Sequence, residues 1–110
     1  MSELLVRPTP PDAAEQVAAL PRRVAHATYA LLARTRDYPY GPHRAPVVVH
    51  YDIEAPSARS TADALRRAMS RGLVDRWGPG LWTPTLLAQD LRGALEDRFL
   101  ADTEAEPPHV

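Results

Sequence analysis

The chain has 110 residues, a length that suits one compact domain with a single hydrophobic core. It contains no cysteine, which excludes disulfides, thiolate metal sites and a cysteine nucleophile. The formal net charge is −1, which excludes a uniformly basic nucleic-acid-binding surface.

The composition also indicates a source and a compartment. All 13 basic residues are arginines, lysine and asparagine are absent, and alanine and proline are abundant. Because G/C-rich codons favour this usage, we expect a GC-rich bacterial or phage genome. No apolar run approaches the roughly 18 residues of a membrane span, and the first residues lack the charged-then-apolar pattern of a signal segment, so we expect a cytoplasmic protein with no membrane partner.

The charges are distributed unevenly along the chain. Residues 22–92 carry 11 arginines against six acidic residues, a net charge of +5. Residues 1–21 have a net charge of −2 and residues 93–110 have a net charge of −4. A basic middle between acidic ends indicates a nucleic-acid surface, although the same charges could simply solvate helix faces.

The first third of the chain predicts an arm and two helices. Residues 1–11 contain three prolines and no periodicity, which is typical of an extended arm. Asp12 followed by Glu15 resembles a capping box and predicts a short helix from residue 13 to about residue 20. After Pro21 the second helix, residues 22–36, is predicted by residues at helical spacing, namely Val24, Ala25, Thr28, Leu31 and Leu32.

The middle of the chain is less regular. Residues 37–46 contain three prolines and one glycine and are expected to form a loop. Residues 47–53 begin with a run of valines that favours a strand, yet Pro46 in front of them suits the first position of a helix. The sequence leaves this segment open between strand and helix.

A helix and a hairpin follow. Residues 57–71 combine a serine-rich start, an apolar stripe and a following glycine, which predict a capped helix. Strands are predicted at residues 73–77 and 81–83 around a Gly-Pro-Gly turn.

Thr83 and Pro84 are expected to start a last helix that ends near residue 102. Residues 103–110 are expected to form an acidic, disordered tail, so the folded domain spans residues 12–102. Its predicted core brings together five leucines: Leu31, Leu65, Leu73, Leu91 and Leu95.

Two adjoining segments carry a resemblance to a known superfamily. The stretch from Ser57 to Val74, SARSTADALRRAMSRGLV, resembles the recognition helix of winged helix-turn-helix transcription regulators. The stretch that follows, DRWGPGLWTP, looks like a short wing and the entry into the next helix. The resemblance implies a mainly α fold with a small β-hairpin wing. It also implies a sequence-specific double-stranded DNA-binding protein that regulates transcription at the nucleoid.

The resemblance implies a role for each polar residue of this region. Helix 57–71 would lie in the major groove, and wing 74–83 would contact the backbone or the minor groove. Arg59 and Arg67 would contact bases, since arginine donates bidentately to guanine, and Arg76 would contact the minor groove or a phosphate. The expected phosphate contacts at the helix start are Ser57, Ser60 and Thr61. The remaining expected contacts on the helix are Asp63, Arg66 and Arg71, with Asp63 either a cytosine contact or a local partner of an arginine.

Two tryptophans flank the predicted turn. Trp77 and Trp82 can face each other across the hairpin and stiffen it. Either they form a binding surface, or at least one of them packs the wing against the helices, which we favour.

Enzymatic and metal chemistry find little support. The chain has no phosphate-binding glycine loop, and its four histidines lack the spacing of a zinc site. We therefore expect no catalytic activity, cofactor or metal.

We expect a homodimer on duplex DNA, because paired half-sites double the contacts of one small module. The expected dimer contacts form an apolar row on the last helix: Leu87, Leu91, Leu95 and Phe99. The chain leaves no room for a small-molecule domain. The alternative function is a winged-helix adaptor that binds a protein and not DNA.

Overall fold

The computed structural model describes residues 9–37, 42–46, 48 and 57–105. The helices are α1 (Ala13–Ala18), α2 (Arg22–Asp37), α3 (Ala58–Ser70), α4 (Leu86–Asp90) and α5 (Arg92–Ala105), and the strands are β1 (His43–Arg44), β2 (Val74–Gly78) and β3 (Leu81–Pro84). The described part of the chain is thus mainly helical, with one small antiparallel sheet. The segment that the sequence left open between strand and helix, residues 47–53, lies outside the described residues except for Val48.

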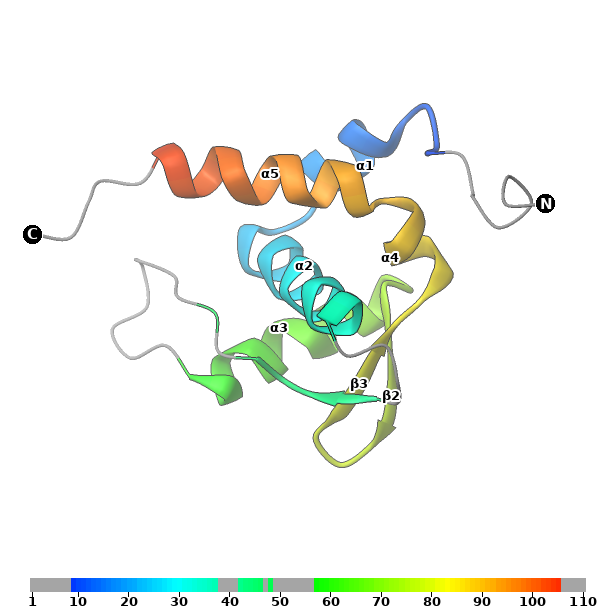
Figure 1. Ribbon diagram of the computed structural model, residues 1–110, viewed down its shortest axis with the longest axis vertical. Helices are drawn as coiled ribbons and strands as arrows, with labels where there is room; N and C mark the ends of the chain where they lie inside the picture. Colours follow the sequence, from blue (N-terminus) through cyan, green and yellow to red (C-terminus); the bar gives the residue numbers. More distant parts are fainter. Residues whose placement is uncertain (1–8, 38–41, 47, 49–56, 106–110) are drawn as a thin grey trace, which may run out of the picture.

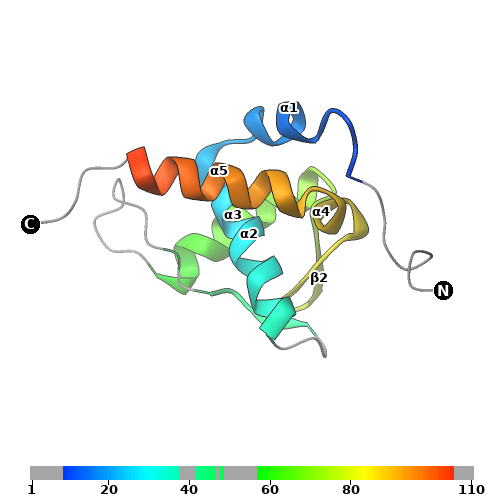
Figure 2. The same ribbon diagram turned by 45° about the horizontal axis from the view of Figure 1, so that its top comes forward.

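The elements form layers around α2. Figures 1 and 2 show α1 and α5 together on one side of α2, and Figure 1 shows α3 and the sheet on the other side. The sheet has the order β1-β3-β2, with β1 and β2 both antiparallel to β3. Helix α2 therefore lies between the layer of α1 and α5 and the layer of α3 and the sheet.

The predicted core is confirmed. All five leucines, from Leu31 to Leu95, are buried in one hydrophobic cluster. The cluster also contains Trp82 and Val74 from the hairpin and Val17 from α1, so every layer contributes to it. The 3.6-residue period on α3 is what turns Leu65 toward α2.

The predicted loop at residues 37–46 is wrong at two positions. His43 and Arg44 form β1, which pairs with Trp82 and Leu81 of β3. The free edge of β3 supplies the hydrogen-bonding partner, so the strand depends on residues almost forty positions later. Local composition carries no sign of such a pairing.

The last helix also differs from the prediction. Thr83 and Pro84 belong to β3, and the cap of α4 is Thr85, whose hydroxyl accepts from the Ala88 amide at 3.3 Å. The same hydroxyl donates to the Gly72 carbonyl at 2.7 Å, which fixes the start of α4 to the end of α3. Helix α5 continues to Ala105, so the first residues of the expected tail are helical.

Arg98 attaches α5 to the end of α1. Its Nη1 donates to the carbonyl oxygens of Val17 at 2.7 Å and Leu20 at 2.6 Å. Its Nε donates to Asp102 at 3.2 Å on the same helix. A helix of six residues has little stability of its own, so these bonds hold α1 in its layer.

Candidate nucleic-acid interface

Helix α3 begins with a reciprocal cap. The Ser57 hydroxyl accepts from the Ser60 amide at 3.2 Å, and the Ser60 hydroxyl accepts from the Ser57 amide at 3.1 Å. The Ser60 hydroxyl also donates to the Ser57 carbonyl at 2.8 Å. Because these groups satisfy the helix start, we assign Ser57 and Ser60 to capping rather than to phosphate contact.

Thr61 was expected at the interface, and this prediction is wrong. Its side chain is 1% exposed and its hydroxyl donates to the Ser57 carbonyl at 3.3 Å. It lies on the core side of α3 with Ala64, Leu65 and Ala68. A threonine with a methyl group fits this apolar stripe, and the sequence pattern alone left its face ambiguous.

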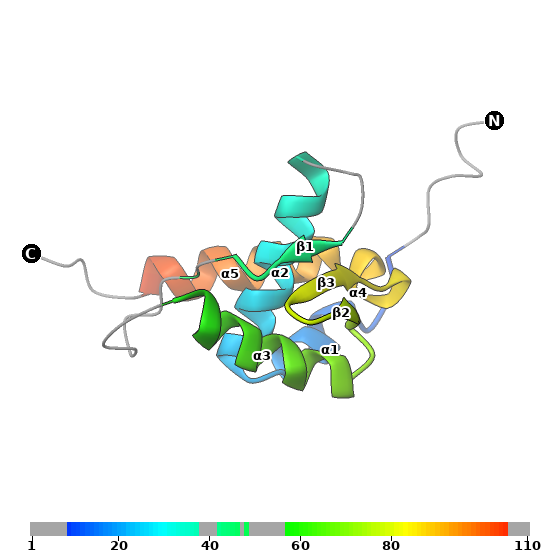
Figure 3. The ribbon, with the colours of Figure 1, turned by 90° about the horizontal axis from the view of Figure 1, so that it is seen from below.

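The opposite face of α3 carries the expected charges. Arg59, Asp63, Arg66 and Arg67 are all exposed, as is Arg71 just after the helix. Figure 3, which views the molecule from below, shows α3 and the hairpin exposed on one face. This surface, defined by the five charged residues named above, is the arginine face.

Two kinds of arginine occur on the arginine face. Arg66 forms an ion pair with Asp63 one helical turn earlier, which assigns Asp63 to a local partner. Arg59 and Arg67 form no ion pair with any residue that the structure describes. No carboxylate among the described residues neutralises these two charges.

The hairpin places Arg76 beside α3. Arg76 is exposed, its Nε donates to the Gly78 carbonyl at 3.2 Å, and its guanidinium lies 5.9 Å from the centre of the Trp82 ring. The ring and the carbonyl restrict the side chain before any ligand arrives. Arg76 pairs with Trp82 across the hairpin, which explains this contact.

The two tryptophans do not face each other. Trp82 is 1% exposed and belongs to the core, whereas Trp77 is 68% exposed. The pairing shifts by one residue between Arg76 and Gly78, which leaves Trp77 without a partner on β3. The prediction that at least one tryptophan packs the hairpin against the helices is confirmed by Trp82, and the expected mutual contact of the two tryptophans is wrong.

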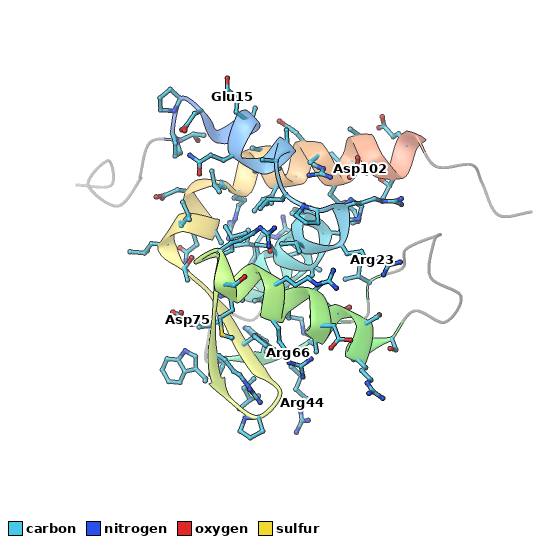
Figure 4. The ribbon with its side chains drawn as sticks, turned by 180° about the vertical axis from the view of Figure 1, so that it is seen from behind. Glu15, Arg23, Arg44, Arg66, Asp75 and Asp102 are labelled. Atoms are coloured by element: carbon cyan, nitrogen blue, oxygen red, sulfur yellow. The ribbon has the colours of Figure 1, made fainter. Side chains whose placement is uncertain are left out.

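Arg44 is a candidate that the sequence did not single out. It is exposed on β1, at the edge of the sheet, where it pairs with Leu81. Figure 4 shows Arg44 and Arg66 projecting at the same end of the molecule. Arg44 belongs to the basic middle of the chain. Because the sequence predicted a loop there, it did not indicate that Arg44 lies on a strand of the sheet.

The fold turns the charge layout of the sequence into opposed surfaces. The layer of α3 and the sheet carries six arginines (Arg44, Arg59, Arg66, Arg67, Arg71 and Arg76) against Asp63 and Asp75, a net charge of +4. The layer of α1, its cap residue and α5 carries six acidic residues (Asp12, Glu15, Glu96, Asp97, Asp102 and Glu104) against Arg92 and Arg98, a net charge of −4. A protein with a net charge of −1 thus presents a strongly positive side.

The four residues of the apolar row expected at a dimer contact differ in their exposure to solvent. Leu91 and Leu95 are buried in the core and do not form an exposed row on the helix, which corrects that part of the prediction. Phe99 packs against Tyr29 and His26, with ring centres 4.9 and 5.0 Å apart. Leu87 remains 37% exposed, and its neighbour Leu86 is 59% exposed.

In residues 9–37, 42–46, 48 and 57–105, no three histidines or carboxylates gather as metal ligands would. None of the helices in this part of the chain has the length and apolar character to cross a membrane.

Comparisons with protein families, with curated proteins and with solved structures found no match to this chain.

Proposed function

We propose that the protein is a winged helix-turn-helix protein that binds double-stranded DNA and regulates transcription. In this proposal α2 and α3 are two of the helices, and β2 and β3 form the wing. The sheet order supports it, because β1 precedes α3 in sequence and joins the sheet on the free edge of β3. Residues 47 and 49–56, between β1 and α3, lie outside the described part of the chain.

The observation that carries the proposal is the pair of uncompensated arginines on α3. Arg59 and Arg67 lie eight residues apart on the exposed side of one helix, so both address one groove. The described part of the chain supplies neither with a carboxylate. An unpaired guanidinium keeps all its donors for guanine O6 and N7 or for phosphate.

The neighbouring arginines supply the non-specific part of the affinity. Arg76 on the wing and Arg44 on the sheet edge flank α3, and both are exposed. Arginines outside the groove contact phosphates, which position the protein without contacting bases. The acidic layer of α1 and α5 lies beyond α2 and therefore points away from the DNA.

The test is the salt dependence of binding to a random duplex. A protein that neutralises Z phosphates shows a slope of about −0.9Z in a plot of log K against log salt. We expect binding at about 50 mM salt with a steep slope, and Arg44→Ala should lower the slope by about one. The matched control is Arg92→Ala on α5, which removes the same charge from the opposite layer and should leave the slope unchanged.

The alternative function, a protein-binding adaptor, is supported by Trp77. A tryptophan that is 68% exposed is typical of a protein contact, because large aromatic residues dominate such interfaces. The adaptor predicts no measurable affinity for duplex DNA at about 50 mM salt. An absence of binding at this salt concentration would favour the protein-binding adaptor over the DNA-binding protein.

A further inference from the structure

A groove lined by leucines lies between α1 and the end of α3 and meets the arginine face at Arg71. Four leucines line it (Leu20, Leu73, Leu87 and Leu91), together with Gln16 and Ala19 of α1 and Arg71 at the end of α3. We call this surface the leucine groove. Its volume is about 290 Å³.

The size of the leucine groove indicates what it holds. Sites for drug-sized ligands span roughly 300–1,000 Å³, and a cavity of roughly 150 Å³ already accepts benzene. The leucine groove is therefore large enough to accept one or two apolar side chains. Leu86, 59% exposed, and Leu87, 37% exposed, stand at the start of α4 beside it. The same surface thus carries both the leucine groove and exposed leucines that could enter the groove of another copy.

The rims of the leucine groove carry opposite charges. On the α1 side, the Gln16 amide donates to Asp12 Oδ1 at 2.9 Å, which places an exposed carboxylate next to a lining residue. On the α3 side, the rim is Arg71, an exposed guanidinium that makes a long contact of 3.4 Å with the Arg67 carbonyl. Gln16 and Arg71 both line the groove, and Figure 1 shows α1 and α3 in different layers, so the acidic and the basic rim come from different layers.

We infer that the leucine groove is a homodimer interface, with a second copy of this chain as its occupant. A two-fold axis in the plane of contact, along the groove, brings each copy's Asp12 rim against the other copy's Arg71 rim. The same rotation brings the leucines of α4 in each copy toward the groove of the other. The two-fold rotation therefore pairs each acidic rim with a basic rim and places the two apolar floors against each other. Arg71 belongs both to the arginine face and to the rim of the leucine groove, but the inference does not depend on DNA binding.

The test uses reversed charges and sedimentation of the full chain. We expect a dimer at tens of micromolar. Arg71→Glu makes both rims acidic and Asp12→Arg makes both rims basic, so either change replaces two attractive pairs by two repulsive ones. Each should weaken the dimer by about tenfold or more. The double variant restores opposite rims and should return the dissociation constant to within a few-fold of the original.

A control and a second variant complete the test. Arg59→Glu reverses a charge near the start of α3, far along the helix from Arg71, and should leave the dimer intact. Leu87→Asp should give a monomer whose far-ultraviolet circular dichroism is unchanged. A monomeric parent protein would overturn the inference, as would a double variant that remains as weak as the single ones. A dimer insensitive to Leu87→Asp would place the contact on another surface.

Discussion

His26 on α2 and Asp102 on α5 are joined by a hydrogen bond of 2.8 Å between Nε2 and Oδ2. Burial lowers the pKa of the His26 imidazole below 6.5, and this effect outweighs the opposing influence of the Asp102 carboxylate. The nearby charges of Arg22 and Arg98 act in the same direction as burial. The neutral imidazole is therefore the form that the folded state prefers.

This pKa shift predicts the pH dependence of stability. When the pKa of a histidine is lower in the folded state than in the unfolded state, the neutral imidazole stabilises the fold. This contribution to the free energy of unfolding is fully present above pH 6.5 and is lost as the pH falls below 6.5. The pKa of Asp102 is also lowered, because the His26 bond and the Arg98 charge outweigh its desolvation, so its contribution is lost only in more acidic solution. Urea denaturation of the parent protein at pH 7.5 and 5.5 should show a smaller free energy of unfolding at the lower pH. In His26→Gln this difference should shrink, and an unchanged difference would contradict the role given to His26.

Arg98 provides a test of the layer formed by α1 and α5. Arg98→Ala removes two bonds to carbonyls at the end of α1 and the contact with Asp102. Hydrogen bonds from a charged donor contribute roughly 1.5–3 kcal/mol, so we expect a loss of about 2–3 kcal/mol in the free energy of unfolding. Hydrogen exchange should show that the amides of α1 lose protection first. Arg92→Ala, an exposed change on the same helix, should cost less than about 0.5 kcal/mol.

Leu65 tests the packing of α3 against α2. Its side chain is completely buried in the common core. Leu65→Ala should lower the free energy of unfolding by about 2–5 kcal/mol, through lost burial and the cavity left behind. Chemical denaturation measures the change, and an unmoved midpoint would mean that α3 is packed by another face.

The two tryptophans should be distinguishable by fluorescence. Trp82 is shielded in the core and Trp77 is open to solvent, so Trp77→Phe should leave a blue-shifted emission that acrylamide quenches poorly. Trp82→Phe should leave a red-shifted, readily quenched emission and should destabilise the fold. Similar quenching of the two variants would contradict the shifted pairing that leaves Trp77 outside.

The elements that the sequence predicted best are those with strong local signals. Helix α3 combines a serine cap with an apolar stripe at helical spacing, and the structure places Leu65 and Ala68 as that stripe requires. The hairpin follows from glycines in positions with positive φ, such as Gly80 at 72°. Such features depend on neighbours a few residues apart.

The features that the sequence missed depend on distant partners. Strand β1 exists because β3 offers an edge, and Thr85 caps α4 while also bonding to Gly72. Leu91 and Leu95 extend an apolar row that suited a dimer, yet the packing of α5 against α2 buries both. A row of apolar residues on a helix indicates that this face is buried. It does not indicate whether the same chain or a second chain buries it.

Base contact by Arg59 and Arg67 of α3 distinguishes a sequence-specific DNA-binding protein from one that only attracts phosphates. The most direct measurement compares Arg59→Ala, Arg67→Ala and Arg76→Ala on a duplex selected from a random pool and on a scrambled duplex. Each α3 variant should lose about 1–3 kcal/mol of discrimination at one position of the selected site and keep much of its affinity for the scrambled duplex. Arg76→Ala should weaken both duplexes about equally and lower the salt slope by about one. Equal, small losses for all three variants on both duplexes would contradict base contact by α3.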